Sequence, residues 1–312
     1  MSNFIEILMN IILPVFIQIG IGFLIQKNFH LNLQTLSKIQ FYAFIPALLF
    51  SKIYTSDIAG GDIGMIMLFG IVLFGAMTLV ATVASRVMGY DIKREKAIVN
   101  AVTLLNSGNF GLPLIELLYA GPLAATALTF QVFFMLTQNI LMNTFGLFNC
   151  TFGKYSLMEG VKKIAKMPMI YTIIIAFALK FLVIPVPSSV LSSTEIMGRA
   201  MVPVAIFTLG AQLAETKIQL NALAVYLPVA LRLIVGPLIG LALIKLLGIE
   251  GLMAQVMFIA SAAPSAVNSM LLSIEFDSDP EYASQTVFIS TLMSAVTVSV
   301  VIIIGQNLFP IL

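Results

Sequence analysis

Apolar segments of about 20 residues follow one another along almost the whole chain, and they constrain the fold more than any other feature. A helix of about 20 residues crosses the hydrocarbon core of a bilayer. Only 10% of the residues are charged and the mean hydropathy is +1.05, whereas a soluble domain carries about 25% charged residues. The sequence therefore predicts an all-α polytopic membrane protein with ten spanning helices, at residues 4–26, 35–55, 63–86, 97–118, 122–146, 167–186, 196–214, 220–246, 251–274 and 281–307.

The scarcity of two residue types excludes several chemistries. Cys150 is the single cysteine and His30 the single histidine, which excludes an intrachain disulfide, a cysteine zinc site and His-pair metal motifs. The net charge of +2 is too small to indicate a nucleic-acid partner. We expect no enzyme activity, no catalytic residues, no metal site and no cofactor, and a lipid bilayer as the main surrounding.

The distribution of basic residues predicts the orientation, because cytoplasmic connections carry the excess of Lys and Arg. With the N-terminus outside, eleven basic residues lie in inner connections and four in outer ones. The inner residues are Lys27, Lys38, Arg86, Lys93, Arg94, Lys96, Lys154, Lys162, Lys163, Lys166 and Lys217, and the outer ones are Lys52, Lys180, Arg199 and Lys245. Both termini are therefore expected outside.

Polar stretches interrupt two of the expected spans. Asn106-Ser107-Gly108-Asn109-Phe110-Gly111-Leu112-Pro113 lies inside the fourth span, and residues 261–269 place small and polar residues around Pro264 in the ninth. Unpartnered polar groups in hydrocarbon cost several kcal/mol, so such stretches are tolerated only where they are buried in protein or line a wet cavity. We expect both helices to break, with Pro113 and Pro264 each at the start of a new half-helix.

The starts of two half-helices would direct free N–H groups and partial positive charge into the protein centre, which suits a small anion such as a carboxylate. Asn106 and Asn109 share a helix face, and Ser265 and Asn268 repeat the spacing. Amides can donate to a carboxylate or coordinate a cation through oxygen. The predicted substrate-binding residues are Asn106, Ser107, Asn109, Pro113, Gln138, Ser265 and Asn268, and Gly108, Gly111, Pro113 and Pro264 form the breaks. The alternative is that these polar groups only hold helices together.

Arg232 lies near the middle of the eighth expected span. An ionisable group at that depth is by default a functional hypothesis. Two interpretations stay open: the guanidinium pairs with the substrate anion, or it binds backbone carbonyls freed by a break. No carboxylate lies at mid-span, which makes proton coupling less obvious. Asparagine, serine and carbonyl groups at the breaks could hold Na⁺, so Na⁺, H⁺ and uniport stay open.

Landmark residues recur at a nearly constant offset. The pairs are Pro14 and Pro168 (154 apart), Pro46 and Pro203 (157), Gly89 and Gly248 (159), and Pro113 and Pro264 (151). Two halves of five helices have opposite topology because five is odd, and inverted repeats with interrupted helices mark the central site of a transporter. We expect one repeat at residues 1–150 and the second at residues 151–312. The alternative is that prolines and glycines are simply common in membrane helices.

Several motifs together resemble the auxin efflux carrier family, which includes the plant auxin carriers and many bacterial carriers. The resemblance covers essentially the whole chain. The motifs are Asn106-x-Gly108-Asn109-x-Gly111-x-Pro113, Phe44-Ile45-Pro46-Ala47-Leu48-Leu49-Phe50, Pro203-x4-Thr208-Leu209-Gly210-Ala211-Gln212-Leu213-Ala214, Arg232-Leu233-x3-Pro237 and Ala263-Pro264-Ser265-Ala266.

This resemblance implies a fold similar to the bile-acid sodium symporters, with two inverted five-helix repeats and with helices four and nine crossing at their prolines. Helices 1, 2, 6 and 7 would form a scaffold, through which a homodimer would assemble. Helices 3–5 and 8–10 would form a transport domain that moves like an elevator. The resemblance assigns a substrate carboxylate to Asn109 and Asn268.

The resemblance also bears on the substrate. Bacterial members, which share the short connection between helices five and six, are associated with malate or other dicarboxylates, which would suit Arg232 in the cavity. The third span, unlike that of the plant carriers, holds no charge between Gly64 and Ala84, which disfavours auxin. We therefore expect a secondary transporter of a small organic anion, malate-like or auxin-like, in a bacterial inner membrane. The alternatives are an anion channel and a substrate sensor that does not transport.

Overall fold

Helices make up all the regular structure that the computed structural model describes, which covers residues 4–55, 60–119, 121–151, 156–216 and 223–311. Within these ranges, six helical runs are long and apolar enough to cross a membrane: Phe4–Phe29, Gly60–Val87, Leu123–Cys150, Ser188–Ala214, Tyr226–Leu246 and Pro280–Leu308. The prediction of an all-helical, multi-pass membrane protein is confirmed at this level. Lys154, Lys217 and the expected start of the eighth span at residue 220 lie outside the described residues.

The elements follow the expected order, with π-helical turns inserted in several helices. The first half contains α1 (Phe4–Ile7), η1 (Leu8–Ile12), α2 (Leu13–Phe29), α3 (Leu33–Ile39), η2 (Gln40–Phe44), α4 (Ile45–Thr55), α5 (Gly60–Val87), α6 (Ile92–Thr103), η3 (Ser107–Gly111), α7 (Leu112–Leu118), α8 (Pro122–Leu141), η4 (Met142–Gly146) and α9 (Leu147–Cys150). The second half contains α10 (Leu157–Ala165), α11 (Pro168–Phe181), α12 (Ser188–Ala214), η5 (Leu223–Val225), α13 (Tyr226–Ala230), η6 (Leu231–Val235), α14 (Gly236–Leu246), α15 (Gly251–Ser261), α16 (Val267–Glu275) and α17 (Pro280–Leu308).

Two of the differences from the expected spans have a clear physical reason. α12 begins at Ser188 rather than at residue 196. Pro187 lies directly before it, and proline is favoured at the start of a helix. The polar residues Glu195 and Arg199 are exposed on the N-terminal part of the helix, so they do not prevent it from extending beyond the apolar segment. The connection between the fifth and sixth spans, expected as a loop at residues 147–166, contains α9 and α10. The apolar residues of α10 recur at helical spacing, which was the missed signal.

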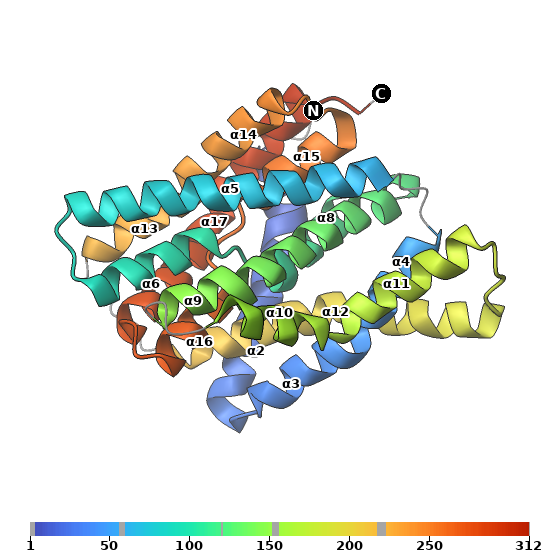
Figure 1. Cartoon of the computed structure of the whole chain (residues 1–312), viewed down its shortest axis with the longest axis horizontal. Coiled ribbons are helices and arrows are strands. Elements are labelled where there is room, and N and C mark those ends of the chain that lie inside the picture. The colour runs from blue at the N-terminus through green and yellow to red at the C-terminus, as the bar shows by residue number, and fades with distance from the viewer. Residues whose placement is uncertain (1–3, 56–59, 120, 152–155, 217–222, 312) are drawn as a thin grey trace.

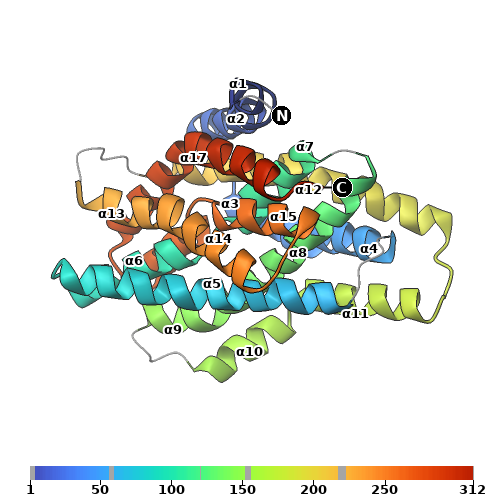
Figure 2. The same ribbon diagram turned by 90° about the horizontal axis from the view of Figure 1, so that it is seen from above.

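Connections gather at opposite ends of the molecule. α5 and α6 meet at the left of Figure 1, where α16 and α17 also meet, whereas α11 and α12 meet at the right. Ion pairs join the two left-hand connections, between Lys93 and Asp277 and between Arg94 Nε and Asp279 Oδ2 (2.8 Å). The acidic connection that contains Asp277 and Asp279 therefore lies beside a basic one. α1 packs against α17, so the first and last helices lie together in both views (Figures 1 and 2).

The helices pack into two groups. In the first group, α2 packs against α12, and α4 packs against α11 and α12. The backbones of α2 and α12 touch at two glycines: a Cβ atom on Gly210 would lie 2.0 Å from the Ile19 carbonyl oxygen, and one on Gly22 would lie 2.1 Å from the Phe207 oxygen. In the second group, α5 packs against α6 and α8, and α15 packs against α8, α14 and α17.

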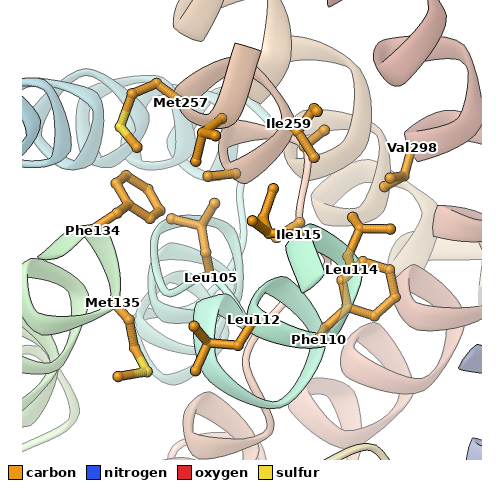
Figure 3. Packing of buried hydrophobic residues seen from close by; sticks show 14 of the residues in the cluster. Leu105, Phe110, Leu112, Leu114, Ile115, Phe134, Met135, Met257, Ile259 and Val298 are labelled. Atoms are coloured by element: carbon orange, nitrogen blue, oxygen red, sulfur yellow. The ribbon is translucent and has the colours of Figure 1, made fainter. Parts of the chain in front are cut away.

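Apolar side chains of the fourth span fill the centre of the second group. Figure 3 shows Phe110, Leu112, Leu114 and Ile115 between side chains of α8, such as Phe134, and side chains of α15 and α17. The apolar side of this segment is thus packed in the core, and its polar residues lie on the opposite side.

Candidate functional site

The segments expected as the fourth and ninth spans are both broken, and the two breaks are hydrogen-bonded to each other. After α6 ends at Thr103 the chain is non-helical until η3, and after α15 ends at Ser261 it is non-helical until α16. The two links run antiparallel. Asn106 N donates to Pro264 O (2.9 Å), and Ala266 N donates to Leu104 O (2.8 Å). The two links thus provide hydrogen-bond partners for backbone N–H and C=O groups that would have none in hydrocarbon.

Both spans break, as predicted. Pro113 is the second residue of α7, close to its predicted place, but η3 precedes α7 in the same helical run, and Pro264 lies outside α16. The second halves begin at Ser107 and Val267. Pro113 lies inside the helical run that follows, directly after the π-helical turn η3, and such turns accommodate irregular positions in a helix. Pro264 lies within the link and supplies the carbonyl that binds Asn106. The position of each break is set by the pairing between links.

A cavity of about 70 Å³ lies beside the crossing. Five of the seven predicted substrate-binding residues line it, namely Asn106, Ser107, Asn109, Gln138 and Asn268, together with Gly108. The other two do not: Pro113 and Ser265 are buried behind the wall, as are the break residues Gly111 and Pro264. Ser265 instead belongs to the crossing, where its backbone N donates to Ser290 Oγ (3.2 Å).

Several buried amides around this cavity lack a partner. Asn106 Nδ2, both polar atoms of Gln138, and Gln212 Oε1 have no hydrogen bond within the described chain, although all three residues are at most 6% exposed. Buried polar side chains are almost always paired. Unpaired amides that converge on one cavity are therefore suited to a polar ligand.

Gln131, unlike Gln138, forms a hydrogen bond to the backbone at the crossing. Its Nε2 atom donates to Ser107 O (2.8 Å), so it pairs a carbonyl at the start of η3. Gly111 makes room for this contact, since a Cβ atom there would lie 2.3 Å from Gln131 Nε2. Gly111 and Gln131 thus support the wall of the cavity from behind.

Arg232 does not line the cavity. It is fully buried, and its guanidinium donates to two backbone carbonyls, with 2.9 Å from Nη1 to Val102 O and a second contact from Nη2 to Ser261 O. Of the two interpretations that the sequence left open, the geometry matches the one in which Arg232 binds carbonyls freed by the breaks. The arrangement does not match a pairing of Arg232 with an anion in the cavity.

A sequence profile of membrane transport proteins matches the chain over residues 7–162 and 152–302. The chain belongs to the auxin efflux carrier family. It is 24% identical over 268 residues to an uncharacterized transporter of Methanothermobacter thermautotrophicus, covering 84% of the chain and 86% of that relative. It is also 24% identical over 304 residues to an uncharacterized transporter of Methanocaldococcus jannaschii, covering 93% of the chain and 96% of that relative. Family and fold together make this protein a multi-pass membrane transporter.

The first helix group contributes polar residues to the carrier's cavity that the sequence reasoning missed. Ser37, Gln40 and Gln212 line it. Gln40 is anchored, because its Nε2 atom donates to Thr208 Oγ1 (2.6 Å). The available signal was an amide isolated in an apolar span, as at Asn106, but single amides carry no pattern that separates a ligand contact from helix–helix contact.

Two larger spaces adjoin the carrier's cavity, and we refer to them as the passage. They measure about 490 and 460 Å³ and share Ser37, Phe41 and Asn268 with the central cavity. Lys38 lines both of them, and Glu275, at the end of α16, lines the larger. The passage therefore runs toward the end at which α16 and α17 meet.

Proposed function

We propose that this carrier is a secondary transporter that binds the carboxylate of a small organic anion where the fourth and ninth spans cross. The observation that carries the proposal is the set of unpartnered amides, Asn106, Gln138 and Gln212, around a cavity at two half-helix starts. The first N–H groups of a helix have no partner within it and carry partial positive charge. Asn109 and Asn268 lie on these first turns and line the same cavity.

The lining favours a single carboxylate on an apolar body. No charged side chain lines the central cavity, so the positive potential there comes from helix ends. Met135, Met142 and Met201 supply an adaptable apolar wall. Because Arg232 lies elsewhere, the second carboxylate of a malate-like substrate would find cationic groups only outside the central cavity, such as Lys38 and Lys166 in the adjoining spaces. We therefore rank monocarboxylates above dicarboxylates.

The location of the cavity supports our proposal of an elevator mechanism. Ser37, Gln40, Phe41 and Gln212 come from α3, η2 and α12, which we assign to the scaffold, and the opposite wall comes from the broken spans and α8, which we assign to the transport domain. Movement of one group along the other would carry the anion across the membrane. With the basic connections in the cytoplasm and both termini outside a bacterial inner membrane, the passage opens inward. A homodimer through the scaffold is part of the same proposal.

Two inverted repeats, residues 1–150 and 151–312, are supported by matching ends of α5 and α14. Gly89 and Gly248 both have positive φ, and both helices close with the same bonds, Tyr90 N to Ser85 O (3.2 Å) and Ile249 N to Ile244 O (3.0 Å). These two glycines are 159 apart, and so are Asn109 and Asn268. Pro113 and Pro264 are 151 apart and occupy different positions relative to the breaks, so they are poor landmarks.

A thermal-unfolding screen tests the proposal. Mono- and dicarboxylic acids are added to the purified carrier with sodium or choline at two pH values, because a ligand that binds only the folded state raises its apparent stability. Sodium or pH dependence of the effect identifies Na⁺ or H⁺ as the coupling ion. No stabilisation by any acid would contradict the proposal. Counterflow of a stabilising acid in liposomes indicates a carrier, a sustained unitary current indicates a channel, and binding without counterflow indicates a sensor.

A further inference from the structure

Arg232 is a buried charge that the proposed substrate does not contact. Its side chain is 0% exposed within the π-helical turn η6, and it takes part in none of the ion pairs of the described residues. A buried charge without a counter-charge is unfavourable. The groups around the guanidinium therefore supply negative potential in another way.

Two half-helices end beside the guanidinium. Nη1 donates to Val102 O, in the last turn of α6, and Nη2 donates to the carbonyl of Ser261, the last residue of α15. The last carbonyls of a helix have no partner within the helix and carry its partial negative charge. The two C-terminal ends thus form a cation site lined by carbonyl oxygens, on the opposite side of the breaks from the half-helix starts.

Glycines of α14 shape this site. A Cβ atom on Gly236 would lie 2.2 Å from Arg232 Nη2 and 3.3 Å from Ser261 O. A Cβ atom on Gly240 would lie 2.4 Å from Ser261 Oγ. A side chain at Gly236 would displace the guanidinium or the carbonyl that it binds, and one at Gly240 would displace the Ser261 side chain. The space is thus built from α6, α14 and α15 together.

We infer that the guanidinium of Arg232 occupies this carbonyl site in place of a metal ion. By binding carbonyls of both helices, it positions α6 against α15. Half-helix C-termini and unwound carbonyls are groups that coordinate alkali cations in carriers. Removing the guanidinium leaves those carbonyls in place. A small cation from solution then occupies the site and restores part of the lost stability.

Thermal unfolding of the Arg232→Ala variant in detergent tests this role. Methylguanidinium, sodium and choline chlorides are compared at equal millimolar concentration. We expect the variant to have a lower Tm than the natural protein, and methylguanidinium or sodium to raise it above its value in choline, which is too large for the site. The natural protein and an Arg199→Ala variant, which removes an exposed arginine, should have the same Tm in methylguanidinium as in choline, and any effect of a coupling sodium ion should be equal in all three proteins. The same Tm for Arg232→Ala in all three salts would overturn the inference.

A second pair of variants decides the question if Arg232→Ala does not yield folded protein. Arg232→Lys keeps a cation near the carbonyls, and Arg232→Met keeps much of the length without the charge. We expect the lysine variant to have the higher Tm. A methionine variant that is equally or more stable would show that the site needs only packing, and would overturn the role of the charge.

Discussion

Gln131 and Gln138 lie two turns apart on α8 and differ in their partners. Gln131 Nε2 pairs with Ser107 O, whereas neither polar atom of Gln138 has a partner within the described chain. Both side chains are buried. The difference separates an amide that supports the crossing from one that is free to bind a ligand.

Leucine substitutions at these two positions should therefore have opposite effects on stability. Gln131→Leu leaves the Ser107 carbonyl unpaired and should cost on the order of 1–3 kcal/mol. Gln138→Leu removes an unpaired buried amide and should raise the Tm while abolishing binding of the organic acid. Thermal unfolding with and without the acid measures both effects. A Gln138→Leu variant that is less stable and still binds would contradict the assignment.

Asn109 and Asn268 are half-buried and line the cavity from the two broken spans. Asn109→Ala and Asn268→Ala should each abolish uptake into liposomes while leaving the Tm nearly unchanged, because the cavity and not the packing is altered. Asn307→Ala is the matched control, since Asn307 is exposed and its Nδ2 atom bonds only within its own helix, to Ile303 O. Uptake that survives both cavity substitutions would remove these asparagines from the site.

At the scale of elements, the space around a glycine shows whether its helix packs closely against another helix at that point. Gly210→Ala places a methyl group 2.0 Å from the Ile19 carbonyl oxygen, so α2 and α12 have to separate. Gly75, within α5, has nothing within 4 Å of a Cβ position, and alanine there should change stability by less than about 1 kcal/mol. We expect Gly210→Ala to lower the Tm strongly and Gly75→Ala to leave it or raise it. Similar Tm values for the two variants would contradict the close packing of α2 and α12.

Four of the five π-helical turns in the described residues lie at the functional elements, and η1 does not. η2, η3 and η4 line the cavity through Gln40, Asn109 and Met142, and η6 carries Arg232. Such turns are frequent at functional sites because they re-aim side chains within a helix. None of them was visible in the sequence, since they cause no change in the apolar pattern.

The sequence predicted that two helices break but not where their second halves begin. The cost of polar residues in hydrocarbon is local, and the run from Asn106 to Pro113 displays it. The start of each half depends instead on bonds between Leu104 and Ala266 and between Asn106 and Pro264, which are far apart in the chain. The role of Arg232 was left open for the same reason, because its partners are carbonyls of two other helices.

At the scale of the whole molecule, the predicted orientation can be read from two positions at opposite ends. Lys38 lines the passage to the cavity and Ser189 is exposed at the start of α12. Cys150 is buried, and Cys150→Ser keeps an acceptor for Asn100 Nδ2, so this substitution gives a cysteine-free background. In whole cells, an impermeant maleimide should label the Ser189→Cys variant and not the Lys38→Cys variant. The reverse labelling would place the termini inside.

The central claim is that a small organic anion is bound between the scaffold and the two broken spans. Phe41 lines the cavity and both spaces that lead to it, and the chain contains no tryptophan. A Phe41→Trp variant therefore carries a single tryptophan, at the site, whose emission can be excited selectively at wavelengths that the eight tyrosines do not absorb. Titration with the organic acids should give a saturable change in its fluorescence, and adding Asn268→Ala should abolish that change. A folded Phe41→Trp variant that responds to no acid, or responds equally with Asn268→Ala, would contradict the account.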